Sequence, residues 1–267
     1  MFADELYLGN PVAVVLDGKG LSTEVMQRFA CWTNLSETTF VLPPEAAGAD
    51  YRVRIFTPSR ELPFAGHPTL GTCHAWLTGG AMPKRGDVVI QECDAGLIGL
   101  RRIDGALAFA APPLLRSGPV DDETLRRIVS ALDVDRADIV DAQWVDNGPG
   151  WVGVLLDSAD AVLALRPGPA DLDIGVAGPY PAGSAEAFEV RAFTPALGGV
   201  GEDPVTGSLN ASLAGWLLAA GHATAPYVAS QGTALGRRGR VHITRDVGGT
   251  IWVGGSTTTG VTGRAEL

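Results

Sequence analysis

An internal repeat is the feature that most limits what this chain can fold into. Residues 51–58 read Tyr-Arg-Val-Arg-Ile-Phe-Thr-Pro and residues 188–195 read Phe-Glu-Val-Arg-Ala-Phe-Thr-Pro, an offset of 137 residues (188 − 51). Thr69 and Thr206 keep the same offset, and each is followed by a small-residue segment that ends in Trp-Leu. A period of this length is too long for a solenoid. The sequence therefore predicts two homologous halves.

We place the halves at residues 1–115 and 116–267. Alternating apolar residues between turn signals predict strands, at 12–16, 38–42, 51–57, 88–93, 97–103, 106–110, 151–156, 188–194, 240–244 and 250–254. Helical periodicity and capping residues predict helices at 22–33, 67–78, 121–132 and 206–220. Many short strands with one helix after the central loop of each half predict an α+β fold, in which each sheet curls around a central helix.

Composition excludes several classes of protein. A formal net charge of −10 over 267 residues disfavours a nucleic-acid partner. Three cysteines without a Cys-x-x-Cys pair favour reduced thiols in the cytoplasm. The start Met-Phe-Ala-Asp-Glu does not look like a signal peptide, and no apolar run reaches the roughly 18–20 residues of a membrane helix. Neither a phosphate-binding glycine motif nor zinc-ligand spacing occurs, so we expect no cofactor and no metal.

The loop Glu61-Leu-Pro-Phe-Ala-Gly-His-Pro-Thr-Leu-Gly71 can carry chemistry at the start of the helix that follows it. Pro68 suits the first turn of a helix, and the amides of that turn, near Gly66, can bind a carboxylate. His67 stands at the same point. The alternative for a lone histidine is an ordinary surface or core position.

The second half repeats this design in Gly201-Glu-Asp-Pro-Val-Thr-Gly-Ser208. Asp203 precedes a proline, and the amides near Gly207 and Ser208 open the next helix. The alternative for Asp203 is a helix N-cap. If the halves are related by a pseudo-two-fold, the two helix starts face each other across a cleft, which favours a functional role for His67 and Asp203.

Glu37 lies between the first predicted helix and the strand that begins at Thr38. The alternative is a solvated turn residue. If the side chain faces the cleft, apolar neighbours such as Phe40 raise its pKa, and it can remove and return a carbon-bound proton.

At these positions the chain resembles the PhzF-like (phenazine-biosynthesis) isomerases, which are relatives of diaminopimelate epimerase. The resemblance rests on Gly9-Asn-Pro-Val-Ala-Val-Val15, Asn34-Leu-Ser-Glu-Thr-Thr-Phe-Val41, Ile55-Phe-Thr-Pro58, the two loops above, and the tail pattern Gln231-Gly…Gly236-Arg…Val253-Gly-Gly255. Members of the family begin one strand earlier, so we expect the first strand of the N-terminal half to be missing here.

The resemblance implies an epimerase-like fold of two pseudo-symmetric domains and a cofactor-independent isomerase. It makes Glu37 the catalytic acid/base, places His67, Asp203 and Ser208 at a small carboxylated substrate, and gives Gly66 and Gly207 as amide donors. The phenazine enzyme moves a hydrogen along the ring of trans-2,3-dihydro-3-hydroxyanthranilate. By analogy with the family, the protein is a homodimer.

Two alternatives stay open. One is a racemase, epimerase or dehydratase of an amino or imino acid, and the other is a small-molecule binder that has lost turnover. The epimerase relatives use two cysteines, whereas this loop reads Ala65-Gly-His67. We interpret Cys31 and Cys73 as packing residues.

Overall fold

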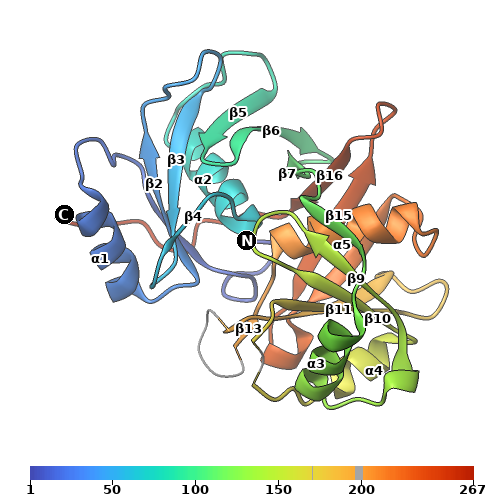
Figure 1. Cartoon of the computed structure of the whole chain (residues 1–267). Helices are drawn as coiled ribbons and strands as arrows, with labels where there is room; N and C mark the ends of the chain where they lie inside the picture. The colour runs from blue at the N-terminus through green and yellow to red at the C-terminus, as the bar shows by residue number, and fades with distance from the viewer. Residues whose placement is uncertain (170, 196–200) are drawn as a thin grey trace. The chain divides into compact units, whose positions relative to one another are not determined.

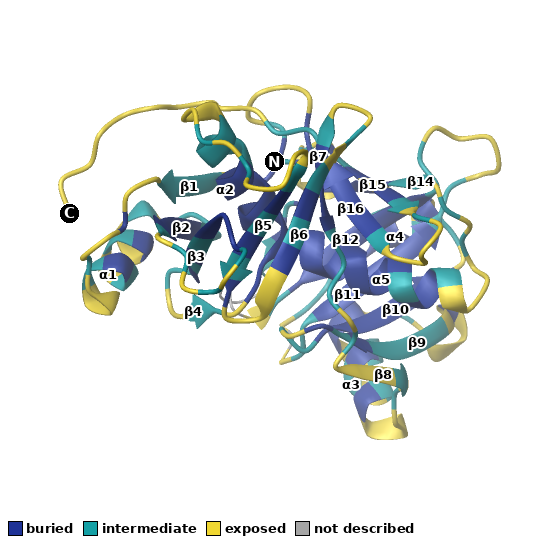
Figure 2. Ribbon diagram, turned by 90° about the horizontal axis from the view of Figure 1, so that it is seen from above, coloured by how far each residue is buried: buried dark blue, intermediate teal, exposed yellow. Residues whose placement is uncertain are grey.

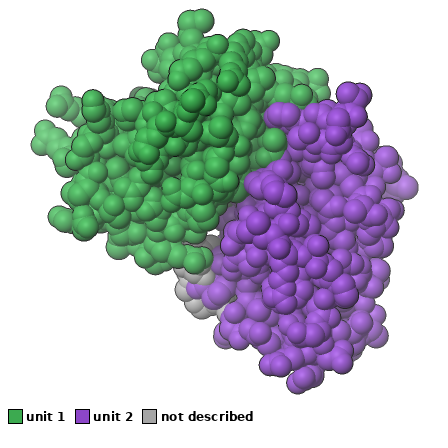
Figure 3. Space-filling model, turned by 45° about the horizontal axis from the view of Figure 1, so that its top comes forward, with its two compact units in different colours: residues 1–110, 254–267 green, residues 111–253 purple. Residues whose placement is uncertain are grey.

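The computed structural model describes residues 1–169, 171–195 and 201–267. The chain divides into two compact units, coloured separately in Figure 3. Unit 1 comprises residues 1–110 and 254–267, and unit 2 comprises residues 111–253. Within the described residues, no helix combines the length and the apolar character needed to cross a membrane.

Unit 1 is a mixed sheet with two helices (Figure 1). Its elements are β1 (Val12–Val15), α1 (Thr23–Thr33), β2 (Glu37–Leu42), β3 (Tyr51–Phe56), β4 (Glu61–Leu62), α2 (Gly66–Thr78), β5 (Val88–Cys93), β6 (Gly96–Ile103) and β7 (Ala106–Ala110). The strand order is β1-β2-β3-β5-β6-β7, and the short β4 pairs with β3. The pairs β1–β2 and β3–β5 are parallel, and the other pairs described in this unit are antiparallel.

Helix α2 is the centre of unit 1. It contacts both β1 and β7, which stand at opposite ends of the strand order, so the sheet curls around it. Helix α2 and strand β1 approach each other closely, and this requires glycine at position 71, because a Cβ on Gly71 would lie 2.4 Å from Cγ1 of Val12. Strand β2 separates α2 from α1: Thr39 accepts a hydrogen bond from Thr72 of α2, and Phe40 packs in the cluster of α1.

The end of the chain belongs to unit 1, although the sequence-based boundary places it in the second half. The backbone N–H of Phe2 donates to the carbonyl of Ser256 at 2.7 Å. The ring of His74 in α2 lies 3.0 Å from the hydroxyl of Thr257 and 2.9 Å from that of Thr259.

Unit 2 is also a mixed sheet around one helix. Its elements are β8 (Arg116–Pro119), α3 (Asp122–Leu132), β9 (Ile139–Asp146), β10 (Val152–Leu156), α4 (Ala159–Ala164), β11 (Ile174–Pro179), β12 (Phe188–Phe193), β13 (Glu202–Asp203), α5 (Gly207–Ala219), β14 (Tyr227–Gln231) and β15 (Gly239–Arg245), with the 3₁₀ turns η1 (Arg136–Asp138) and η3 (Thr233–Leu235). Strand β16 (Ile251–Gly255) spans the boundary between the units. The strand order is β16-β15-β14-β12-β11-β10-β9-β8, and β13 pairs with β12.

Helix α5 is buried for most of its length against the inner face of this sheet (Figure 2). Glycines on the strands make room for its large side chains. A Cβ on Gly175 would lie 2.2 Å from Leu209, and one on Gly153 would lie 2.8 Å from Trp216. Residues of α3 and α4 form an apolar core with the strands. Its larger members are Ile128, Leu132, Ile139, Val152, Val154, Leu156, Val162, Leu165, Ile174, Val176 and Phe193.

The repeat in the sequence corresponds to a repeat of elements. Strands β3 and β12 begin 137 residues apart, as the sequence predicts, whereas α2 and α5 begin 141 residues apart (207 − 66). The pairing of Thr69 with Thr206 is therefore wrong. Thr69 is the fourth residue of α2, and Thr206 is the N-cap of α5. Part of the loop responsible, residues 196–200, lies outside the described residues.

The same ion pair occurs at the same place in both units. In unit 1, Arg54 of β3 binds Glu61 of β4 through Nε–Oε1 and Nη2–Oε2 contacts of 2.7 and 2.6 Å. In unit 2, Arg191 of β12 binds Glu202 of β13 through the same atoms at 3.0 and 2.7 Å. Each pair fixes the short strand that leads to the central helix of its unit.

The α+β class and every predicted strand and helix are confirmed, with ends shifted by at most two residues. The sequence missed β8, β9, α4, β11, β14 and the two-residue strands β4 and β13.

Candidate functional site

The structure brings Glu37 and His67 together in unit 1. Glu37 is the first residue of β2, and His67 is the second residue of α2. Oε2 of Glu37 lies 3.1 Å from Nε2 of His67, and the two side chains are 15% and 3% exposed. Gly66 is the first residue of α2, directly before His67. Of the predicted site residues, Glu37, Gly66 and His67 therefore lie together in unit 1.

The chain reaches Glu37 through a tight helix end. Asn34 is the C-cap of α1 and adopts a left-handed conformation with φ 53°, which asparagine tolerates better than most residues. The strand then starts at Glu37, whereas the sequence places Glu37 before it. Hydrogen bonds hold the start of β2 from both sides: Thr38 to Thr33 at 3.0 Å, and Thr39 to Thr72 at 2.8 Å.

Asn10 completes the cluster. It is fully buried just before β1, and its Nδ2 lies 3.2 Å from Nδ1 of His67. An amide nitrogen can only donate, so in this arrangement Nδ1 of His67 is the acceptor and a neutral ring carries its proton on Nε2. That nitrogen faces Oε2 of Glu37.

His67 is neutral at physiological pH. Burial, assisted by the positive amino terminus, lowers the pKa of its imidazole from 6.5 to about 3. The contact of 3.1 Å with Glu37 therefore sets a neutral ring, and no positive charge, beside the carboxylate. Whether apolar surroundings raise the pKa of Glu37, as the sequence suggests, stays a prediction.

The second group of candidate residues lies in unit 2. Asp203 ends β13 and is 9% exposed, and Gly207 and Ser208 are the first two residues of α5. The N-cap of α5 is Thr206, so the alternative that Asp203 is the N-cap is wrong. The hydroxyl of Thr206 donates to Oδ2 of Asp203 at 2.6 Å. These residues form one buried polar cluster.

The side chains at the N-caps of α2 and α5 leave the amides of the first turn uncapped. Ser22 and Asp121 cap α1 and α3 by accepting hydrogen bonds from backbone N–H groups. Ala65 at α2 has no side-chain acceptor, and Thr206 makes no cap hydrogen bond at α5. Uncapped amides at a helix N-terminus are the groups that bind carboxylates and phosphates.

Three site residues were missed from the sequence. Asn10 orients His67, Thr206 binds Asp203, and the buried Gln231 at the end of β14 donates to Thr206 at 2.9 Å. Asn10 and Gln231 both stand in segments that carry the resemblance, and that is the one signal by which they could have been singled out.

The cysteines do not suit acid/base chemistry by paired thiols. Cys73 is buried in α2, and burial raises the pKa of its thiol to about 12. Its interpretation as a packing residue is confirmed. The same interpretation of Cys31 is wrong, because Cys31 is exposed on α1. In the described part of the chain, no group of three or more histidine, cysteine, aspartate or glutamate side chains is placed to hold a metal ion.

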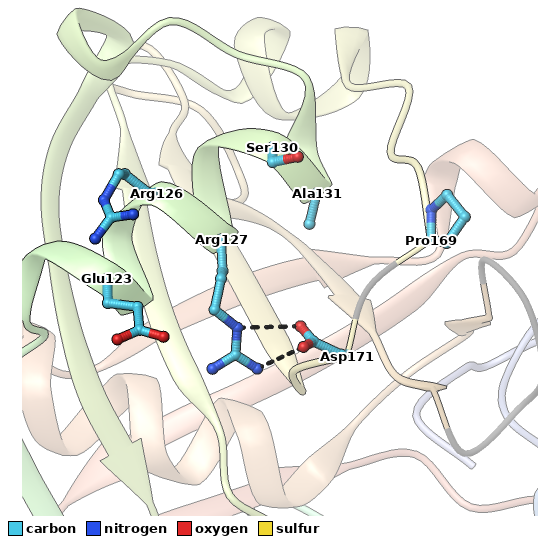
Figure 4. A pocket seen from close by; sticks show the side chains of 7 residues that line it. All are labelled: Glu123, Arg126, Arg127, Ser130, Ala131, Pro169 and Asp171. Atoms are coloured by element: carbon cyan, nitrogen blue, oxygen red, sulfur yellow. Dashed lines mark hydrogen bonds and ion pairs between the residues drawn. The ribbon is translucent and has the colours of Figure 1, made fainter.

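Two surface pockets of unit 2 lie elsewhere. One, of about 310 Å³, adjoins α3, and the ion pair of Arg127 with Asp171 crosses it (Figure 4). The other, of about 420 Å³, is lined by residues of 111–114, α5 and 248–251. None of the candidate residues lines either pocket, so we assign neither a role in the site.

The fold defines the class of protein: an α+β chain of two repeated units, each a sheet curled around a helix, which is the epimerase-like fold. The chain belongs to the PhzC-PhzF family, described as phenazine biosynthesis-like protein, whose model matches residues 1–266.

Individual relatives agree with this assignment. The chain is 39% identical to trans-2,3-dihydro-3-hydroxyanthranilate isomerase of Pseudomonas aeruginosa, over 90% of this chain and 86% of the relative. It is 35% identical to antisense-enhancing sequence 1 of Schizosaccharomyces pombe, over 100% and 97%. The crystal structure of a PhzF-family phenazine biosynthesis protein from Enterococcus faecalis superposes with a TM-score of 0.78 at 25% identity, covering 100% of this chain and 96% of that one.

Proposed function

We propose that this protein is a cofactor-independent isomerase that moves a proton between carbon atoms of a small carboxylated substrate. Family membership supports the isomerase class, since a relative of 39% identity is named an isomerase. The observation that carries the proposal is the buried contact of 3.1 Å between Glu37 and His67.

Glu37 is the acid/base of the proposed reaction. As a carboxylate it takes a proton from carbon, and as a carboxylic acid it returns that proton to another carbon while the double bond shifts. The N–H of His67 orients Oε2 of Glu37, and Asn10 fixes the ring. Because burial keeps His67 neutral, the ring serves as a fixed donor rather than as the cation of an ion pair.

Asp203, Gly207 and Ser208 bind the substrate in this proposal. The uncapped amides at the start of α5 donate hydrogen bonds to its carboxylate. Asp203 receives a donor group of the substrate, such as an amine or hydroxyl. A cyclic amino or hydroxy acid related to dihydrohydroxyanthranilate meets these requirements.

Two other functions give different results in one experiment. Small cyclic amino and hydroxy acids are incubated with the protein in D₂O and examined by mass spectrometry. An isomerase adds deuterium and changes the position of a double bond. A racemase or epimerase exchanges the α-hydrogen and leaves the bonds in place.

A protein that binds without turnover gives no mass shift with any compound, although calorimetry detects binding. That result would contradict the proposed isomerase.

A further inference from the structure

Gln231 lies at the centre of the buried hydrogen-bond network of unit 2. It is the last residue of β14 and is fully buried. Its Oε1 accepts from the backbone N–H of Thr206 at 2.9 Å and from Nδ2 of Asn210 at 2.8 Å. Its Nε2 donates to the carbonyl of Asp203 at 3.1 Å and to Oγ1 of Thr206 at 2.9 Å. All four hydrogen-bonding positions of the amide are used.

These partners fix which way the amide points. The two groups that face Oε1 are both donors, so a reversed amide would set N–H groups against N–H groups. Nε2 therefore faces Thr206, and the hydroxyl oxygen of Thr206 must accept from it. The single proton of that hydroxyl is left to point at Oδ2 of Asp203, which lies 2.6 Å away.

We propose that Gln231 is a positioning residue which, through the hydroxyl of Thr206, holds Asp203 as an ionised, hydrogen-bond-accepting carboxylate. The proposal rests on the proposed function only for the claim that Asp203 meets the substrate. A hydrogen bond donated to a carboxylate favours its charged form. Here the Thr206 hydroxyl donates to Asp203 because its oxygen already accepts from the amide of Gln231.

Unit 1 also contains a buried glutamine whose amide contacts a threonine hydroxyl. Gln91 of β5 donates from Nε2 to Oγ1 of Thr69 at 2.9 Å, and its Oε1 accepts from the hydroxyl of Tyr51 at 3.0 Å. In the pairing of β4 with β3, Leu62 stands opposite Ile55, as Asp203 stands opposite Ala192 in unit 2. A buried glutamine amide thus contacts a threonine hydroxyl in each unit, at positions that are not equivalent, and in unit 2 that hydroxyl also contacts a carboxylate.

The charged residues beside this network are few among the described elements that pack on it. Arg191 and Glu202 on β12 and β13 are bound to each other. Arg237 lies next to Gly232, against which the carbonyl of Pro204 also packs. None of the three is altered in the variants below, so their fields act equally on Asp203 in every protein compared.

The test measures ionisation of Asp203 directly, with carboxyl-¹³C NMR of the full chain. Asp203→Asn identifies the signal. In the unaltered protein we expect the Asp203 signal to be that of an ionised carboxylate at neutral pH. Thr206→Val and Gln231→Leu each raise the pKa of Asp203 by about one pH unit, since each removes or frees the hydroxyl proton. Thr206→Ser keeps the hydroxyl and restores the original value.

Gln91→Leu is the matched control. It removes a buried amide of the same kind, and we expect it to lower the melting temperature while the pKa of Asp203 stays unchanged. An Asp203 pKa above 6 in the unaltered protein overturns the proposal even if Gln231→Leu fails to fold. So does a Thr206→Val variant with an unchanged pKa. Neither readout involves turnover, so an inactive or misassigned enzyme is recognised separately by the D₂O experiment.

Discussion

At the scale of single residues, burial decides what His67 can do. An exposed histidine titrates near neutral pH, but the ring of His67 is 3% exposed and burial lowers its pKa to about 3. Asn10 lies 3.2 Å from one ring nitrogen, and Glu37 lies 3.1 Å from the other. A ring that stays neutral between these two residues is suited to positioning them and carries no charge at neutral pH.

This leads to a prediction about acid stability. Between pH 6.5 and 3 the native protein binds fewer protons at His67 than the unfolded chain does. The free energy of unfolding therefore falls as the pH drops below 6.5, by about 1.4 kcal/mol per pH unit. His67→Gln removes this contribution to the slope. His74→Gln has a smaller effect of the same sign, since burial also lowers the pKa of the less buried His74. Urea unfolding at several pH values measures the slope.

NMR of the imidazole nitrogens checks the same point independently. We expect the Nε2–H form of His67 from pH 8 down to about 5. A His67 signal that titrates near 6.5 would contradict the neutral donor.

At the scale of elements, the two ion pairs on the short strands differ in burial. The side chains of Arg191 and Glu202 are 6% and 9% exposed, while those of Arg54 and Glu61 are 18% and 26% exposed. Arg191 also donates to the carbonyls of Val162 and Leu165 and so anchors α4. Leaving the Arg191 guanidinium without its carboxylate partner is therefore expected to cost more free energy than leaving the Arg54 guanidinium without its partner.

Glu202→Gln is accordingly expected to cost about 3–5 kcal/mol of unfolding free energy, because it leaves a buried guanidinium without a countercharge. The equivalent Glu61→Gln should cost about 1 kcal/mol or less, since water reaches that pair. Denaturant titration of both variants gives the comparison. An equal loss of unfolding free energy in the two variants would contradict the expectation that the more buried pair contributes more.

The elements also show where sequence reading succeeds and fails. Strands β3 and β12 carry apolar alternation and are followed, two residues beyond their ends, by proline, and α3 has acidic residues at its start, so all three were predictable. Strand β11 was not, because Gly175 and Gly178 interrupt its pattern. Those glycines are required by tertiary packing, against Leu209 and the carbonyl of Ser158. Helix α4 has only six residues, too few to show a period.

The site residues also divide into those that the sequence predicts and those that it does not. Glu37, His67 and Asp203 stand out because titratable residues occur beside helix starts and turns. Asn10, Thr206 and Gln231 are neutral residues whose roles depend on partners 57, 3 and 25–28 residues away along the chain. No local pattern encodes the long-range partnerships of Asn10 and Gln231, so the contacts themselves come from the fold.

At the scale of the whole molecule, the proposed enzyme moves the proton with its own side chains and needs no metal ion. Dialysis against a chelator should therefore leave deuterium incorporation unchanged, within the error of the assay, because the proton is moved by a carboxylate rather than by a metal-bound group. A loss of rate that returns with added metal ions would contradict this. The homodimer and the cytoplasmic location stay predictions.

Glu37 is the group that moves the proton in the proposed reaction, and the proposed function depends on it above all. The direct measurement is solvent-deuterium incorporation by Glu37→Gln, with Glu45→Gln, an exposed glutamate of the same unit, as the matched control. We expect Glu37→Gln to keep its fold by circular dichroism and to lose incorporation by at least about 100-fold, in line with the loss of a general acid/base. The control should retain the full rate. A folded Glu37→Gln protein that incorporates deuterium as fast as the unaltered one would contradict the central claim.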